Sequence, residues 1–178
     1  MSFYTALRRS LLAIFLVLLL FSLTACKTPA PDIASESYDG ADPEDTAADG
    51  MTCTLIIRCD TILDHLDSLT EGKEELVPED GLLLEATGIP FTEGESVFDV
   101  LKRELQSRRM HLEFSETPVY DSVYIEGICN LYEYDCGELS GWTFRVNGET
   151  PGYSCSKYFL SDGDVIEWLY TCDLGDDL

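Results

Sequence analysis

The pattern of apolar and polar residues changes twice along the 178 residues of the chain. An apolar run broken only by Ser22, Leu11–Leu23, is followed by a polar, acidic stretch, Lys27–Gly50. From residue 51 onward, apolar and polar residues alternate in short segments. The apolar run is shorter than the roughly 20 residues of a membrane-spanning helix, but its length is typical of a signal peptide. The pattern therefore predicts a leader over residues 1–25, a linker over 26–50 and a folded domain over 51–178.

The end of the leader, Leu23-Thr24-Ala25-Cys26, resembles the lipobox of bacterial lipoproteins. The resemblance implies cleavage before Cys26, which then carries the lipid anchor, and attachment to the extracytoplasmic face of a bacterial cell membrane. An ordinary cleaved signal and an uncleaved anchor are the alternatives. The linker holds seven acids and three prolines, a composition that predicts a disordered tether.

Within the domain, one segment has the apolar period of a helix and several have the period of a strand. Ser96 and Asp99 form an approximate capping box before an apolar stripe that includes Leu101 and Leu105. The acidic segment Asp60–Asp80 is expected to be a partly helical excursion, and Gly88–Pro90 a break. One helix packed on one face of a sheet gives the α+β class. The expected strands are Thr52–Arg58, Leu82–Glu85, His111–Phe114, Val123–Ile128, Trp142–Val146 and Asp164–Thr171.

Turn residues and side-chain alternation add detail to the last two strands. Asn147-Gly148 after the strand ending at Val146 predicts a tight hairpin turn. Arg145 and Glu167 both fall on the outer, polar side of their strands, so we expect them to form a cross-strand pair.

The charge of the chain excludes two classes of partner. Its formal net charge is −23, and residues 51–178 alone carry 27 acidic against eight basic side chains. Such a surface repels phosphate backbones and anionic lipid headgroups, so neither nucleic acid nor a headgroup surface is expected as a partner. The four basic residues in Lys102–Arg109 are expected to complement the dipole of the helix rather than to bind an anion.

Apart from Cys26, the chain has six cysteines, an even number that indicates disulfides in an exported domain. Cys53 and Cys59 lie on one expected strand, roughly 20 Å apart, and cannot bond each other. We expect Cys59 to pair with Cys172 if the first and last strands are parallel neighbours, and Cys136 to pair with Cys155. Zinc is the alternative use of the thiols, but the chain has no CxxC pair, so no metal is expected.

No motif indicates catalysis: the chain has no HExxH, no phosphate loop and no nucleophile–histidine arrangement with a recognisable context. We therefore expect no enzyme and no cofactor. The aromatic side chains are the remaining candidates for binding, since aromatic groups with polar tips suit flat ligands and protein interfaces. Phe144 and Trp168 are expected in the core. The ligand-binding candidates are Tyr132, Tyr134, Trp142 and Tyr153.

Four segments of the domain together resemble a known family, the transcobalamin-like C-terminal domain (DUF4430-type). Gly94–Leu101 is similar to the Gly-x-Ser-Val opening of its helix, and Tyr124–Ile128 to its Tyr-Ile strand. Gly141–Gly148 looks like its Gly-Trp to Val-Asn-Gly hairpin, and Tyr158–Trp168 like its closing segment. The resemblance implies a β-grasp-like fold, a mixed sheet with one main helix on one face.

The resemblance also implies a function. In cobalamin carriers this domain forms half of a clamp on the corrinoid, and the helical barrel that forms the other half does not fit in this chain. The expected protein is a membrane-anchored surface lipoprotein that captures a corrinoid-like nutrient and passes it to a membrane transporter. A cell-surface protein–protein interaction or adhesion module without a small-molecule ligand is the alternative.

Overall fold

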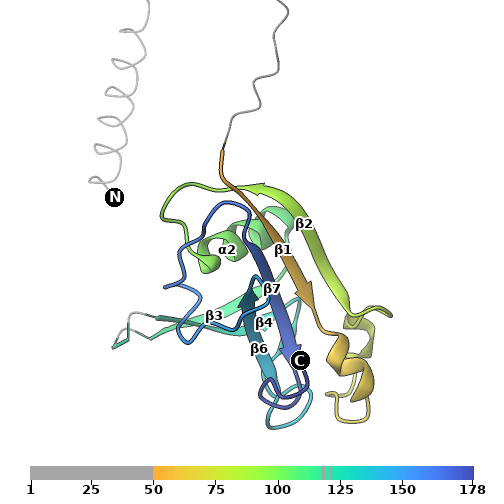
Figure 1. Cartoon of the computed structure of the whole chain (residues 1–178). Helices are drawn as coiled ribbons and strands as arrows, with labels where there is room; N and C mark the ends of the chain where they lie inside the picture. The colour runs from red at the N-terminus through yellow and green to blue at the C-terminus, as the bar shows by residue number, and fades with distance from the viewer. Residues whose placement is uncertain (1–49, 118, 121) are drawn as a thin grey trace, which may run out of the picture. The chain divides into compact units, whose positions relative to one another are not determined.

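The computed structural model describes residues 50–117, 119–120 and 122–178, which all fall within one compact unit, Asp45–Leu178. Strands are the main regular elements of this unit, and α2 is the one α-helix among the described residues (Figure 1). In chain order the elements are β1 (Thr52–Arg58), the 3-10 helices η1 (Asp60–Asp64) and η2 (Glu74–Leu76), β2 (Leu82–Pro90), α2 (Val97–Arg108), β3 (Leu112–Thr117), β4 (Ser122–Ile128), β5 (Leu131–Tyr132), β6 (Gly141–Val146) and β7 (Val165–Thr171).

A four-stranded mixed sheet, with strand order β2-β1-β7-β6, forms one layer of the domain. β1 runs parallel to β7, whereas β1 with β2 and β6 with β7 are antiparallel pairs. Alternate residues of β1, such as Leu55 and Ile57, are fully buried because successive side chains of a strand point to opposite faces. The mixed sheet confirms the α+β, β-grasp-like fold predicted from the sequence.

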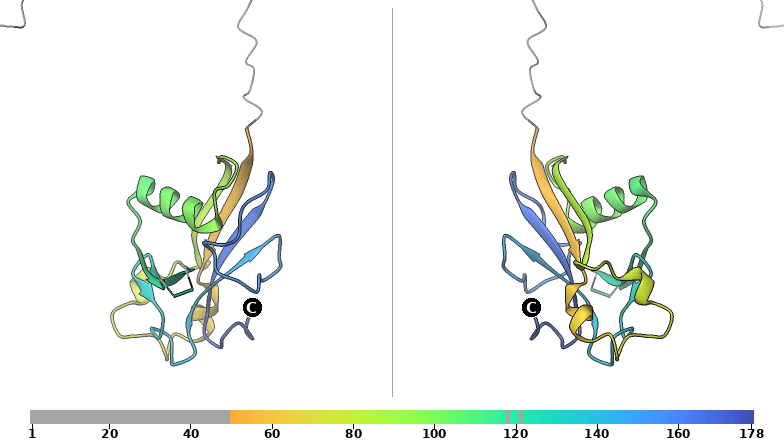
Figure 2. Two further views of the ribbon diagram at one scale, coloured as in Figure 1. Left: turned by 90° about the vertical axis from the view of Figure 1, so that its left-hand side faces the viewer. Right: turned by 90° about the vertical axis from the view of Figure 1, so that its right-hand side faces the viewer.

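The helix α2 lies on one side of this sheet (Figure 2). It begins where the sequence predicts: the backbone N–H of Asp99 donates to Ser96 Oγ at 3.2 Å, and the N–H of Ser96 donates to Asp99 Oδ2 at 2.9 Å. This reciprocal capping box satisfies two N–H groups that would otherwise lack partners at the start of the helix. The buried stripe of the helix is Val97, Phe98, Val100, Leu101 and Leu105.

The sequence predicts one sheet, whereas the structure places β3, β4 and β5 in a second sheet with the order β3-β4-β5. Cys129 and Asn130 both have positive φ, 53° and 64°, and their tight turn folds the chain from β4 back onto β5. β5 pairs only with Gly127 and Ile128, at the end of β4, and β3 pairs along the whole of its other edge.

Two predicted boundaries differ from the structure. The expected break at Gly88–Pro90 lies inside β2, where Gly88, at φ 63°, falls at a register shift between β1 and β2. A β-bulge thus accommodates Gly88, and the edge strand β2 continues to Pro90. Asn147 and Gly148 do form the predicted tight turn, with φ of 55° and 81°. It does not join two paired strands, because β6 pairs with β7 instead.

The predicted leader, the lipid anchor Cys26 and almost all of the predicted linker lie outside the described residues. Within the described part of the chain, no helix is both long and apolar enough to cross a membrane.

Candidate functional site

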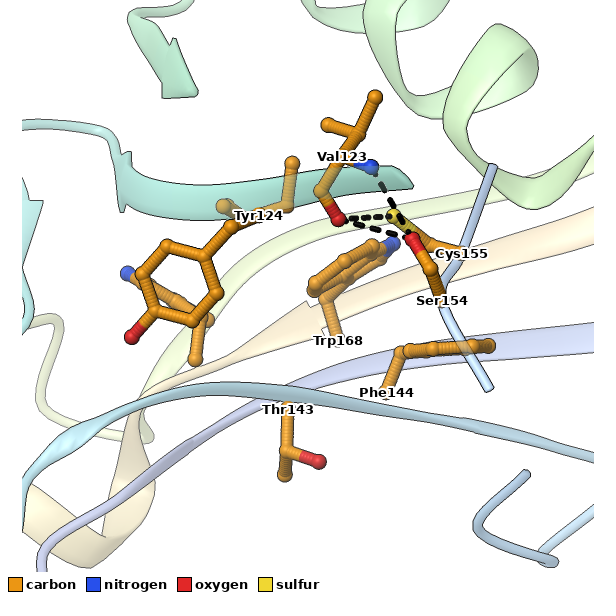
Figure 3. Close-up of a pocket in the computed structure, with 9 residues that line it drawn as sticks. Val123, Tyr124, Thr143, Phe144, Ser154, Cys155 and Trp168 are labelled. Atoms are coloured by element: carbon orange, nitrogen blue, oxygen red, sulfur yellow. Dashed lines mark hydrogen bonds between the residues drawn. The ribbon is translucent and has the colours of Figure 1, made fainter. Parts of the chain in front are cut away.

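A cavity of about 190 Å³ lies where the two sheets meet (Figure 3). The second sheet contributes residues 123–125 of β4 to its lining, and the first sheet contributes residues 142–144 of β6 and Trp168 of β7. Ser154 and Cys155, from the segment between β6 and β7, complete the lining. The cavity thus depends on four segments that are far apart in the sequence.

Aromatic side chains form the wall on the side of the first sheet. Phe144 lies directly opposite Trp168 in the antiparallel register of β6 and β7, and their ring centroids are 5.3 Å apart. Two register positions along, the ring of Trp142 meets Tyr170 edge to face at 5.2 Å. All four residues are buried. Aromatic pairs at these separations attract each other, which stabilises this wall.

The segment Ser154–Ser156 closes the cavity on the side of β4. Ser154 Oγ donates to the carbonyl oxygen of Val123 at 2.8 Å, and the N–H of Val123 lies 3.2 Å from both Ser154 Oγ and Ser156 Oγ. These hydrogen bonds, several of them drawn in Figure 3, satisfy the backbone of Val123 on the edge of β4 that faces away from β3. Side chains therefore replace a strand at this end of the cavity.

The two indole groups that line the cavity differ in one respect. Trp142 Nε1 donates to the carbonyl oxygen of Leu131 at 2.8 Å. Trp168, which is only 2% exposed, has an Nε1 with no hydrogen-bond partner, and it is the only such buried side-chain nitrogen or oxygen among the described residues. A buried donor without an acceptor costs about 1–3 kcal/mol. Trp168 thus brings to the lining a buried hydrogen-bond donor that the protein itself does not use.

No side chain that is charged at neutral pH lines the cavity. Burial raises the pKa of the Cys155 thiol to about 11, so at neutral pH it is a neutral thiol and a poor nucleophile. Tyr124 donates from its phenol to Glu133 Oε2 at 2.5 Å, and burial followed by this contact raises its pKa above the usual range. The lining offers apolar surface, hydroxyl groups and one free N–H.

The four binding candidates from the sequence take different places. Trp142 lines the cavity, and Tyr153, 56% exposed, precedes Ser154 and stacks on Tyr158. Tyr132 does not line the cavity: its hydroxyl lies 3.0 Å from His111 Nε2. Tyr134 is exposed and outside the lining. The structure therefore brings together two of the four, Trp142 in the lining and Tyr153 beside it.

Trp168 and Phe144, expected in the core, are indeed buried, but they also line the cavity. Sequence analysis did not single out Ser154. The sequence feature that could have identified it is the Ser-x-Ser spacing of Ser154 and Ser156, which places two hydroxyl groups at the end of β4.

The cysteines are arranged differently from the predicted pairings. β1 and β7 are parallel neighbours, but Arg58 is level with Leu169, so Cys172 lies beyond the end of the ladder and away from Cys59. All six cysteines of the described residues are free thiols in the structure, those of the two predicted pairings included. Among the described residues, no group of three or more His, Cys, Asp or Glu side chains is placed to hold a metal ion.

Comparison with protein families matches residues 94–171 to the family described as "Domain of unknown function (DUF4430)". The match spans all four segments in which the sequence resembles the transcobalamin-like domain, and it confirms that prediction. Among the curated proteins, none matches the chain.

Two solved structures similar to this chain represent different kinds of protein. One is described as a "putative metal binding protein" from Ruminococcus gnavus, with 16% identity, a TM-score of 0.41, and coverage of 68% of this chain and 96% of that one. The other is haptocorrin in complex with Cbi, with 11% identity, a TM-score of 0.48, and coverage of 68% of this chain and 25% of that one. This chain thus spans about a quarter of the length of haptocorrin.

Proposed function

Since residues 94–171 match the DUF4430 family and resemble the transcobalamin-like domain, we propose that the chain is a non-enzymatic, membrane-anchored binding protein that captures its ligand at the cavity between the two sheets. The observation that carries the proposal is the unpaired Nε1–H of Trp168 in the lining. A ligand with a carbonyl or another hydrogen-bond acceptor gives this donor its missing partner.

The size of the cavity limits what enters it. Pockets that enclose whole small molecules have volumes of roughly 300–1,000 Å³. At about 190 Å³ this cavity takes one projecting group, such as an amide, while the rest of the ligand stays on the surface. A site that binds an amide through a buried donor discriminates against analogues without the acceptor, because the donor then stays unpaired.

A corrinoid is the ligand that we propose to test first. The motifs of the domain resemble those of the cobalamin carriers, and the rim of a corrinoid carries several amide side chains. One such amide fits the size and the hydrogen-bonding character of the cavity, with its carbonyl oxygen accepting from Trp168 Nε1. The flat macrocycle then lies outside the cavity, within reach of exposed aromatic groups such as Tyr153.

Binding without catalysis fits the chemistry of the lining. A proton-transfer catalyst needs a group whose pKa lies near the working pH. The lining holds no carboxylate and no imidazole, and the pKa of its one thiol, Cys155, is raised to about 11.

Membrane attachment through lipidated Cys26 and delivery to a transporter are further parts of the proposal. They rest on the lipobox-like segment before Cys26. Labelling the full chain with a radioactive fatty acid in a bacterial host tests the anchor. We expect label in the membrane fraction for the natural chain and none for Cys26→Ser. Equal labelling of both chains would contradict the lipid anchor at Cys26 but would not bear on ligand binding at the cavity.

Calorimetric titration of the purified protein with cobinamide and cobalamin tests the ligand. The Trp168→Phe variant keeps an aromatic ring but loses the donor, so we expect its affinity to fall about tenfold, the effect of one hydrogen bond of about 1–1.5 kcal/mol. Tyr134→Phe, outside the lining, is the matched control and is expected to bind like the natural protein. No heat with either corrinoid at high micromolar concentration would contradict corrinoid capture.

Exposed aromatic surface favours a protein partner as the second candidate. Tyr153 stacks on Tyr158 at 5.9 Å, and Phe159, next in the chain, is 63% exposed. Aromatic residues are enriched at protein interfaces. The test is crosslinking on intact cells: this candidate predicts one specific adduct that Phe159→Ser abolishes, and it fails if that variant leaves the crosslinking pattern unchanged.

A further inference from the structure

Two cysteines meet at the end of the β6–β7 ladder. Gly141 and Thr171 form the last register pair of these two strands. Just beyond it, Cys172 follows Thr171, and Ser140, which precedes Gly141, accepts a hydrogen bond from the backbone N–H of Cys136 at 3.0 Å. The ladder therefore brings the Cys136 segment and the Cys172 segment to the same place.

Independent contacts locate both sulfur atoms there. Cys136 Sγ lies 3.4 Å from the carbonyl oxygen of His65, and Cys172 Sγ lies 3.9 Å from Thr61 Oγ1, so both thiols contact the η1 region. The N–H of Leu174 donates to the carbonyl oxygen of Leu139 at 3.1 Å, which joins the backbones of the two segments. The two thiols also influence each other's pKa, which places them close together.

We propose that Cys136 and Cys172 form a disulfide that locks the end of the β6–β7 ladder, and with it the two strands that carry Trp142 and Trp168. The pairing differs from both pairings expected from the sequence, and it does not depend on the proposed ligand. Its effect is to hold the C-terminal segment, residues 173–178, against the turn that precedes β6.

The chemistry is thiol–disulfide exchange with a disulfide oxidant such as oxidised glutathione. One cysteine thiolate attacks the oxidant and releases one glutathione thiol, and the second cysteine then displaces the other glutathione. Two S–H bonds are lost, one S–S bond forms within the protein, and the two electrons and two protons end on two glutathione thiols. Burial raises the pKa of both cysteines, that of Cys172 to about 12, so few thiolates are present at neutral pH and the reaction is followed to completion.

Peptide mapping tests the pairing. The reduced full chain is incubated with oxidised glutathione, its free thiols are alkylated, and it is digested with trypsin and a glutamyl endopeptidase. Cleavage at Glu133 separates Cys136 from Cys129, and cleavage at Lys157 separates Cys172 from Cys155. We expect a crosslinked peptide pair containing Cys136 and Cys172. Alkylation of both residues, or their crosslinking to other cysteines, would overturn the proposal.

The midpoint temperature of unfolding provides a second measurement. A crosslink over a loop of this length is expected to raise the midpoint by about 10 °C. We expect the rise in midpoint temperature caused by the oxidant to be about 10 °C smaller in Cys172→Ser than in the natural chain. In Cys53→Ser, the part of the rise that comes from the Cys136–Cys172 disulfide should be unchanged. The same oxidant effect in the natural chain and in Cys172→Ser would contradict a disulfide at this position, whatever the other thiols do.

Discussion

Arg145 on β6 lies directly opposite Glu167 on β7, and both side chains are half-buried on the face of the sheet opposite to Phe144 and Trp168. This confirms that the two residues face each other across the strands on one face, as the sequence predicts. Opposite charges facing each other across an antiparallel pair contribute about 0.2–1 kcal/mol, and like charges in the same place are unfavourable.

Exchanging these charges is the first test. Arg145→Glu places two carboxylates opposite each other, so we expect a lower free energy of unfolding. The double variant Arg145→Glu, Glu167→Arg restores opposite charges and is expected to recover most of the loss. Urea unfolding of the natural protein, Arg145→Glu, Glu167→Arg and the double variant gives the coupling, for which about 0.2–1 kcal/mol is expected. Additive effects of the two changes would show that the residues do not interact.

The start of α2 provides a second prediction. Ser96→Ala removes the hydroxyl that accepts from the N–H of Asp99 and also donates to its carboxylate at 2.6 Å. We expect the free energy of unfolding to fall by about 0.5–2 kcal/mol, the usual effect of losing an N-cap. Ser107→Ala, an exposed position near the end of the same helix, should change stability little. Equal effects of the two changes would contradict the role of the cap.

Gly127 on β4 provides a third prediction. A Cβ at this position would lie 2.8 Å from a ring carbon of Tyr132, whose ring is also fixed by His111 and by Lys73 Nζ, 4.8 Å from the ring centroid. Overpacking of this kind costs about 1–3 kcal/mol, so Gly127→Ala is expected to be destabilising. Gly141→Ala, whose Cβ would meet its neighbours at ordinary distances, is the control. A neutral Gly127→Ala in thermal unfolding would refute the tight contact.

Alkaline pH tests the buried phenol of Tyr170. This residue is 1% exposed, its hydroxyl donates to the carbonyl oxygen of Tyr132 at 2.7 Å, and burial raises its pKa above the usual value of about 10. Because the pKa is higher in the folded state, the stabilisation is fully present below about pH 10 and is lost as pH rises toward the folded pKa. We expect the stability advantage of the natural protein over Tyr170→Phe to shrink between pH 8 and pH 11 in urea unfolding. A difference that does not change with pH would contradict the burial of the hydroxyl.

Local signals in the sequence were enough to predict much of the fold. β1 was predicted to the residue because apolar side chains alternate within Thr52–Arg58, and α2 because Ser96 and Asp99 cap it. These features depend on neighbours along the chain. The second sheet was not predicted because one of its edges is the two-residue strand β5, which is too short to show an alternation of apolar and polar side chains.

The site was less predictable, for a physical reason. The burial of Trp168 follows from its strand pattern, but whether its Nε1 has a partner depends on residues brought near by the tertiary fold. The same holds for the cysteines: the prediction aligned the ends of two strands, whereas β7 continues past the ladder before Cys172. Three of the aromatic candidates, Tyr132, Tyr134 and Tyr153, were expected to be exposed, whereas Trp142, which lines the cavity, is buried.

The most direct test of capture at the cavity uses the indole N–H signals. The chain has two tryptophans, Trp142 and Trp168, and both line the cavity, so a ¹⁵N-labelled protein gives two such signals in a nuclear magnetic resonance spectrum. On titration with cobinamide, we expect the Trp168 signal, assigned by its loss in Trp168→Phe, to move downfield as its N–H gains an acceptor. The Trp142 N–H already donates to Leu131 and should move little. Saturating ligand with no change in the Trp168 signal would contradict the central claim.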